Sequence, residues 1–199
     1  MKNHIPIQKK GAESVAGSEL TLPTIAEAES HFELVKKRFN DINSWNLFAG
    51  KEKAEFSLRN SNDELLMRPP QVGDFVKIKI PLLHNTAEDG FDWVKVEVYE
   101  REIKENFESI YLRLRPTANP TLNADEIVHF LDSSSTSNFV ITRDAETITA
   151  DVYARNEIPN TKDKSVAAKV RNKAVALGGM LIGSKMQWEA LTSGLLEHE

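Results

Sequence analysis

The chain contains no cysteine among its 199 residues. Disulfide bonds, thiolate nucleophiles, iron–sulfur clusters and cysteine-ligated zinc sites are therefore excluded. No stretch approaches the roughly 20 consecutive apolar residues of a membrane-spanning helix, and residues 1–10 lack the apolar core of a secretion signal. We therefore expect a cytoplasmic protein without a membrane span.

The chain also lacks a concentration of basic charge. It has 25 Lys and Arg against 30 Asp and Glu, a formal net charge of -5, and both signs are spread along its length. Nucleic acid is not an expected partner, because binding to a phosphate backbone needs a basic surface. The five histidines have no second ligand at a recognised metal-binding spacing, so we predict no metal and no cofactor.

The start of the chain has no hydrophobic period. Residues 1–19 predict a flexible tail, and residues 20–199 a single domain of ordinary size. Thr24 is placed to cap a helix, with Glu27 three residues later completing a capping box. Apolar residues at helical spacing follow, so the pattern predicts an amphipathic helix that ends between residues 40 and 45.

The middle of the chain alternates apolar and polar residues, which is typical of antiparallel strands with one buried face. In four clear runs, apolar residues fall on one face and mainly charged or aromatic residues on the other: Phe56–Leu58, Val76–Ile80, Val94–Val98 and Ile110–Leu114. Further strands are expected near residues 128–131 and 138–142, followed by a hairpin that turns at residues 143–145. No crossover helix separates these runs, so we predict a meander of six or seven strands.

The end of the chain returns to helical spacing. Residues 165–196 predict one helix of about 30 residues, on the order of 45 Å long. Gly178, Gly179 and Gly183 fall inside it, where each costs up to about 1 kcal/mol relative to Ala. A kink, a close approach to strand backbones, or space left for a ligand would each explain them.

This order of elements resembles the START-like or Bet v 1-like (SRPBCC) superfamily, whose members have a helix-grip fold. Two segments carry the resemblance: "SNFVITRDAETITADVYARNEIP" at residues 137–159, similar to the last hairpin of that family, and "MQWEALTSGLLE" at residues 186–197, similar to the end of its last helix. The resemblance implies an α+β fold in which a curved antiparallel sheet wraps around the C-terminal helix and encloses a hydrophobic cavity.

From this resemblance we expect noncatalytic binding of a small apolar or amphipathic ligand between sheet and helix. The expected ligand-binding residues are Trp93, Val96, Ile110, Leu112, Phe139, Leu177, Met180 and Leu181, with Trp93 at the cavity entrance because it faces away from Val94 and Val96.

Two alternatives remain open at this point. One is a cyclase- or hydrolase-type enzyme that uses the same cavity, with His129 or Arg113 turned inward, although the alternation places His129 on the polar face. The other is a protein-interaction domain with a filled core, contacting its partner through Trp93 and residues 81–92. A homo-oligomer is compatible with either, and no catalytic residue is assigned.

The basic residues of the strands favour a simpler interpretation than an anion site. Lys77, Lys95, Arg113 and Arg115 would share the outer face of the sheet with interleaved acidic residues such as Glu97. Such a face is typically solvated and joined by cross-strand ion pairs, each contributing about 0.2–1 kcal/mol.

Overall fold

A computed structural model describes residues 4–49, 54–79, 91–122, 127, 129, 131–160 and 174–198, with side chains of the last helix described from residue 185. Its elements follow in this order: β1 (Ala12–Thr21), α1 (Ile25–Asn40), η2 (Ile42–Ser44), α2 (Trp45–Ala49), β2 (Glu55–Arg59), β3 (Phe75–Lys79), β4 (Phe91–Lys104), β5 (Phe107–Pro116), β6 (Thr136–Asp144), β7 (Thr147–Glu157) and α4 (Ala174–Leu196).

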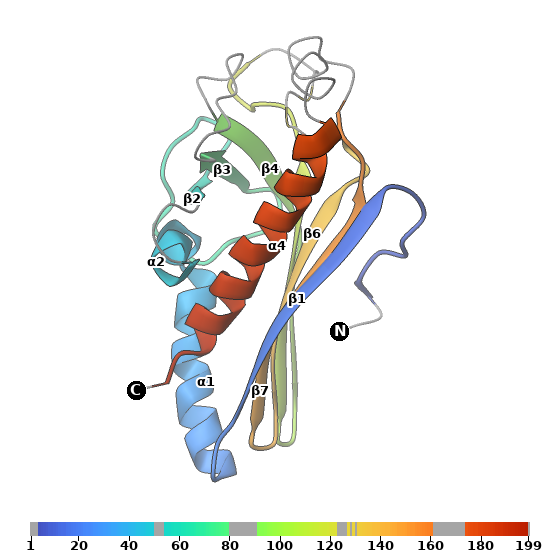
Figure 1. Ribbon diagram of the computed structural model, residues 1–199. Helices are drawn as coiled ribbons and strands as arrows, with labels where there is room; N and C mark the ends of the chain where they lie inside the picture. The colour runs from blue at the N-terminus through green and yellow to red at the C-terminus, as the bar shows by residue number, and fades with distance from the viewer. Residues whose placement is uncertain are drawn as a thin grey trace.

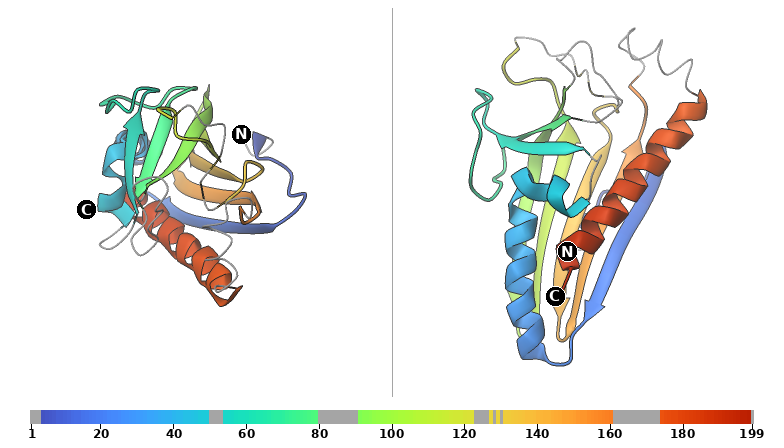
Figure 2. Two further views of the ribbon diagram at one scale, coloured as in Figure 1. Left: turned by 90° about the horizontal axis from the view of Figure 1, so that it is seen from above. Right: turned by 60° about the vertical axis from the view of Figure 1, so that its left-hand side comes forward.

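The strands form one antiparallel sheet in the order β1-β7-β6-β5-β4-β3-β2. The sheet is curved, and α4 runs obliquely across its concave side, with α1 and α2 beside it (Figure 1). The two further views show α4 on the open side of the curved sheet, next to β1 (Figure 2). The predicted α+β class, the strand count and the curved antiparallel sheet around a C-terminal helix are confirmed.

Strand β1 corrects the expectation of a flexible tail over residues 1–19. Residues 12–19 instead pair with β7 along its length, and Ala16 is buried. The hydroxyl of Ser18 lies 3.0 Å from that of Thr192 and joins β1 to α4. The sequence did not predict this strand, because its small and polar residues show little apolar alternation. Its strand conformation depends instead on backbone hydrogen bonds to β7 and on packing against α4.

Helix α1 begins where the sequence predicts. The backbone N–H of Glu27 donates to Thr24 Oγ1 over 3.2 Å, and the helix ends at Asn40. Its apolar stripe, which includes Phe32 and Phe39, is buried against the concave face of the sheet. This inner face of the sheet carries the main core, and the opposite side is called the outer face below.

The outer face is joined by ion pairs, as predicted. Glu97 of β4 pairs with Arg115, and its other oxygen lies 3.6 Å from Arg113 Nη1. Lys77 Nζ lies 2.7 Å from the carboxylate of Asp63. These basic side chains already have acidic partners, so they do not form an anion site.

Helix α4 is continuous through Gly178, Gly179 and Gly183. The expected start of this helix at residue 165 lies outside the described residues. A close approach does occur at Gly194, where a Cβ atom would overlap the backbone oxygen of Phe48 in α2. The absence of a side chain therefore lets α4 cross α2 closely. None of the described helices is long and apolar enough to cross a membrane.

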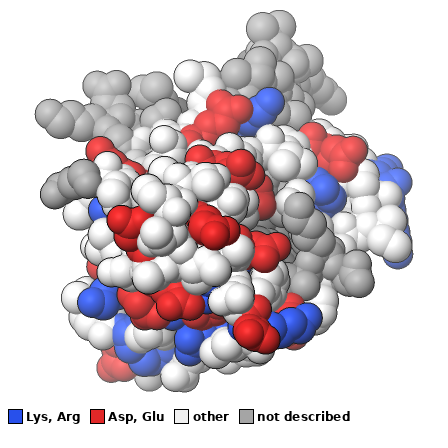
Figure 3. Space-filling model, turned by 90° about the horizontal axis from the view of Figure 1, so that it is seen from below, with Lys and Arg blue, Asp and Glu red and all other residues white. Residues whose placement is uncertain are grey.

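Two hairpin turns lie at the lower end of the sheet in Figure 1. They join β4 to β5 and β6 to β7, and Asn106 and Ala145 adopt positive φ values of 55° and 50° there. The turn predicted at residues 143–145 is thus confirmed. Viewed from this end, acidic and basic side chains are interspersed over the visible surface (Figure 3).

Candidate functional site

A partly enclosed pocket of ≈ 80 Å³ lies between the inner face of the sheet and α4. This inner cavity is several times larger than the space that one water needs. Most of its wall is apolar. Its apolar side chains include one from each of the strands β2 to β6 and one from the segment before β6, with Trp188 of α4 on the remaining side: Phe56, Ile78, Val94, Leu114, Phe139 and Leu131. It lies toward the end of the sheet where β2 and β3 pair.

Aromatic rings make up the inner wall of the cavity. The ring centroid of Trp188 lies 5.1 Å from that of Phe139 and 6.0 Å from that of Phe56. Behind them, the fully buried Trp45 packs against both phenylalanines, and its indole N–H donates to the carbonyl of Phe39 over 3.0 Å. Rings of this size pack with defined geometry, so the wall has a fixed shape.

One end of the cavity is polar. His129 and Glu157 both line it and are only 5% and 6% exposed. The backbone N–H of Leu131 donates to His129 Nδ1 over 3.0 Å, which leaves the ring proton on Nε2 when the imidazole is neutral. Glu157 Oε2 is buried without a hydrogen-bond partner in the described part of the chain. The cavity therefore combines an apolar body with two titratable groups.

Two connecting segments hold this polar end in place. The side-chain amide of Asn160 donates to the carbonyls of Ile127 and His129, over 2.6 Å and 3.1 Å. Ser135 Oγ donates to the carbonyl of Asn156 over 3.0 Å and accepts from the backbone N–H of Ile158. These bonds position the residues around His129 beside the end of β7.

Burial acts on the two titratable groups in opposite directions. It lowers the pKa of His129, an effect that the charge of Asp92 and the bond from Leu131 partly oppose. Burial raises the pKa of the Glu157 carboxyl. Both shifts favour the uncharged form, as expected where water is largely removed. Opposed shifts at one end of a cavity are also a common feature of functional sites.

Glu157 was not expected from the sequence because β7 is irregular near its end. Ile148, Ala150, Val152 and Ala154 face inward in alternation. The register then shifts by one residue, since Ser14 pairs with Ala154 but Ala12 pairs with Glu157. Asn156 has a φ of 55° at this bulge. The bulge turns Glu157 inward, where simple alternation would place its neighbour.

The expected wall residues separate into several environments. Phe139 lines the inner cavity. Val96 and Leu112 are fully buried in the packed core away from the cavity lining. Ile110 is buried where it borders a different groove, beside α1. The side chains of Leu177, Met180 and Leu181 lie outside the described residues.

Trp93 does not line the inner cavity, in contrast to the expected entrance role. It lies on the outer face, as its alternation with Val94 predicts, but it is only 3% exposed. Lys77 Nζ lies 5.2 Å from the centroid of its ring, and the ring of Phe75 packs edge-on against it. Neighbouring side chains therefore cover Trp93. Most of the proposed contact loop, residues 81–92, lies outside the described residues.

The two polar candidates also have different positions from those expected. His129 was expected on the polar face but is buried and lines the cavity, because it lies in a bend and not in a strand. Arg113 is on the outer face, where its guanidinium donates to Tyr111 and to the carbonyl of His4. Arg113 therefore cannot act in the cavity.

A larger and more open groove of ≈ 510 Å³ lies between α1, β4 and residues 67–69. Charged side chains line much of it, and two of the basic ones are already paired: Lys36 with Glu108, and Arg68 with Asp74. The inner cavity is smaller, yet it is less open and mostly apolar, which is the usual character of a small-molecule site. It is therefore the better candidate site.

No group of three His, Asp or Glu side chains suited to a metal ion is present among the residues that the structure describes. The polar end of the inner cavity contributes one histidine and one carboxylate, which is fewer than the three protein ligands usual in zinc enzymes. The chemistry available there is hydrogen bonding and proton transfer.

Several solved structures are similar to this chain. A hypothetical protein jhp0584 from Helicobacter pylori is 14% identical, with a TM-score of 0.46, over 90% of this chain and 86% of that chain. Ara h 8.0201 is 13% identical, with a TM-score of 0.36, over 94% and 100%. A truncated norcoclaurine synthase from Thalictrum flavum is 11% identical, with a TM-score of 0.32, over 98% and 100%.

No protein-family model and no curated protein sequence matches the chain. The similarities to solved structures are weak in both identity and superposition. The helix-grip description therefore rests on the order and pairing of the chain's own elements.

Proposed function

We propose that the protein binds a small apolar or amphipathic ligand in the inner cavity, without catalysing a reaction on it. One observation carries the proposal: a partly enclosed pocket walled by Phe139, Trp188 and Phe56 lies beside the packed core. Such a space leaves its walls without contacts on one side. An apolar molecule that enters it would restore those contacts and be removed from water.

The size and wall chemistry support a compact ligand. A pocket of ≈ 80 Å³ suits a small ring or short chain better than a long lipid. The aromatic rings of Phe139 and Trp188 line it, which favours a ligand with an aromatic body. The polar end at His129 and Glu157 provides a hydrogen-bonding position for a head group.

Titration with benzyl alcohol tests this proposal, followed by the ¹H–¹⁵N signals of the three tryptophan indoles. We expect the Trp188 signal to shift in a saturable way, while that of Trp93 on the outer face changes little. Ser137 lines the cavity and is partly exposed. Ser137→Leu should fill the space and abolish the shift, whereas Ser30→Leu, on the exposed side of α1, should not.

The alternative enzyme function has one specific observation in its favour. His129 and Glu157 line one cavity and have pKa values shifted in opposite directions, and a neutral imidazole and a carboxyl can together move a proton on a bound molecule. A panel of small aromatic esters tests it. Turnover that His129→Gln and Glu157→Gln each abolish, while benzyl alcohol still binds, would support the hydrolase over the binding protein.

A further inference from the structure

The inner cavity contains a buried oxygen atom whose capacity to accept a hydrogen bond is not used. Glu157 Oε2 is buried and has no hydrogen-bond partner among the described residues, and Glu157 as a whole is only 6% exposed. An unmet buried acceptor costs about 1–3 kcal/mol, and more when it is charged. Since Glu157 lines the cavity, a ligand in that space can reach it.

Three of the neighbouring polar groups already have partners. Ser135 Oγ donates to one carbonyl and accepts from one backbone N–H. Thr136 Oγ1 accepts from the side-chain amide of Asn138 over 3.0 Å, and His129 Nδ1 accepts from Leu131. The unmet requirement at this end is therefore a hydrogen-bond donor directed at Glu157.

The charge of the Glu157 carboxylate favours a cationic donor on the ligand over a neutral one. Neither Lys nor Arg is present among the described residues that line the cavity. A carboxylate that lies in an apolar space without a cation is strongly disfavoured. A ligand with a cationic donor would satisfy both the oxygen and the missing counter-charge, whereas an alcohol would satisfy the oxygen alone.

We infer that the ligand of the inner cavity is a small aromatic or aliphatic amine, whose ammonium group pairs with the Glu157 carboxylate while its apolar body packs against Phe139 and Trp188. This inference rests on the proposed binding function and specifies the ligand class. A carboxylic acid is disfavoured, because it would place a second acid beside Glu157 with no Lys or Arg in the described wall.

Binding of an amine should change the protonation state of Glu157, and this change can be measured. Burial holds the pKa of Glu157 above its ordinary value in the free protein. When an ammonium group arrives, the carboxyl releases its proton to solvent and the two groups form an ion pair. Binding of the amine should therefore release protons and tighten as the pH rises through the range in which free Glu157 titrates.

Calorimetric titration with benzylamine, benzyl alcohol and toluene tests the inference on the full chain. These probes share one ring and differ in the head group. We expect benzylamine to bind at least about tenfold more tightly than benzyl alcohol, since charge-assisted hydrogen bonds contribute about 1.5–3 kcal/mol. Repeating the benzylamine titration in buffers of different ionisation enthalpy should reveal the released proton.

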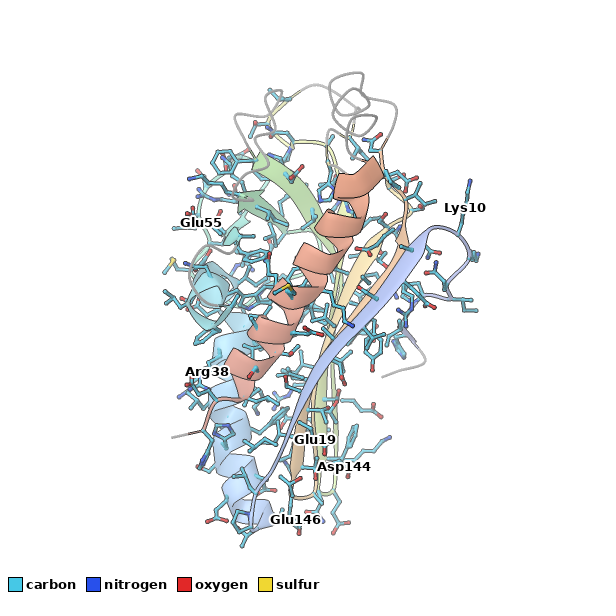
Figure 4. The ribbon with its side chains drawn as sticks, in the orientation of Figure 1. Lys10, Glu19, Arg38, Glu55, Asp144 and Glu146 are labelled. Carbon is cyan, nitrogen blue, oxygen red and sulfur yellow. The ribbon has the colours of Figure 1, made fainter. Side chains whose placement is uncertain are left out.

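Two variants test whether Glu157 is responsible for the preference for benzylamine. Glu157→Gln keeps the shape of the side chain and should reduce the preference for benzylamine to about one, while toluene binding persists. Glu19→Gln is the control, because Glu19 is exposed on β1 and lies toward the hairpin end of the sheet, far from β2 and β3 (Figure 4). It should leave all three affinities unchanged and so exclude general attraction of a cation to an acidic protein.

The possible outcomes distinguish a failure of the amine inference from a failure of the proposed binding function. If toluene and benzyl alcohol bind but benzylamine has no advantage, or if Glu157→Gln retains that advantage, the amine inference is wrong and the binding proposal stands. If none of the three probes binds, the binding proposal itself is contradicted. A preference that Ser137→Leu leaves intact would place the amine outside the cavity and also overturn the inference.

Discussion

The indole of Trp188 packs edge-on against the ring of Phe139, with centroids 5.1 Å apart and planes at 88°. This contact joins α4 to β6 directly beside the inner cavity, since both residues line it. The same two side chains therefore attach the C-terminal helix to the sheet and form the proposed ligand wall. Stability and ligand binding should consequently respond together when either is changed.

Trp188→Ala should reduce the free energy of unfolding by about 3 kcal/mol, the lower end of the range for removing a large aromatic side chain, because Trp188 is only partly buried. Trp188→Phe retains a ring against Phe139 and should cost less than half as much. Urea denaturation measures both. A loss below about 1 kcal/mol for the alanine variant would show that this contact contributes little to holding α4 on the sheet.

Lys36 connects α1 to the β4–β5 hairpin through a largely buried ion-pair cluster. Its Nζ lies 2.6 Å from Glu33 Oε1 and 2.9 Å from Glu108 Oε1, and Arg101 also pairs with Glu108 over 2.7 Å. Lys36→Met should reduce the free energy of unfolding by about 2 kcal/mol, because Glu108 stays buried with one fewer partner. Thermal or urea unfolding checks this.

Lys37→Met is the matched control for that change. Lys37 is the next residue on α1 but is exposed, so the substitution should alter stability by no more than about 0.5 kcal/mol. Equal losses for the two variants would mean that helix propensity or surface charge, and not the buried cluster, accounts for the effect.

Gly194→Ala should destabilise the protein although Ala is the better helix former. A methyl group at this position would overlap the backbone oxygen of Phe48, so α2 and α4 would have to separate. Overpacking of this kind costs about 1–3 kcal/mol, more than the roughly 1 kcal/mol gained in helix propensity. Differential scanning calorimetry should give a lower Tm for Gly194→Ala and an unchanged or higher Tm for the exposed neighbour Ser193→Ala.

The titration of Glu157 should make stability depend on pH in a defined direction. Burial raises its pKa in the folded protein above the ordinary value of 4.5, so the unfolded chain loses this proton first as the pH rises. The contribution of Glu157 to stability is therefore greatest below about pH 4.5 and decreases as the pH rises through the folded-state pKa.

Comparing Glu157→Gln with the wild type isolates this effect, because every other titrating group is shared, including His129 with its opposite shift. The variant should gain stability relative to the wild type as the pH is raised from 4 to 7, measured by urea denaturation at each pH. A stability difference that stays constant across this range would contradict the buried, unpaired position of the carboxyl.

Local patterns predicted much of this fold. The capping residues Thr24 and Glu27, and the alternation around Val76 and Val94, are short-range signals that depend on few distant contacts. The edge strand β1 could not be predicted in the same way, because its pairing with β7 is a long-range interaction between a weakly patterned segment and its neighbour.

The candidate site was predicted less well than the fold. The inward position of Phe139 follows directly from strand alternation. The inward position of Glu157 depends on the bulge at Asn156, and that of His129 depends on the hydrogen bonds that Asn160 makes to the bend. Trp93 was placed on the correct face, yet its burial by Phe75 and Lys77 depends on the register between β3 and β4. Such details arise from irregular or long-range geometry, which periodicity does not encode.

The most direct test of the account is a crystal structure of the protein with 4-bromobenzylamine, located by the anomalous signal of bromine. The account predicts one well-occupied site in the inner cavity beside Phe139 and Trp188, with the amine nitrogen within hydrogen-bond distance of Glu157 Oε2. A bromine position on the outer face or in the groove beside α1, with the inner cavity unchanged, would contradict it.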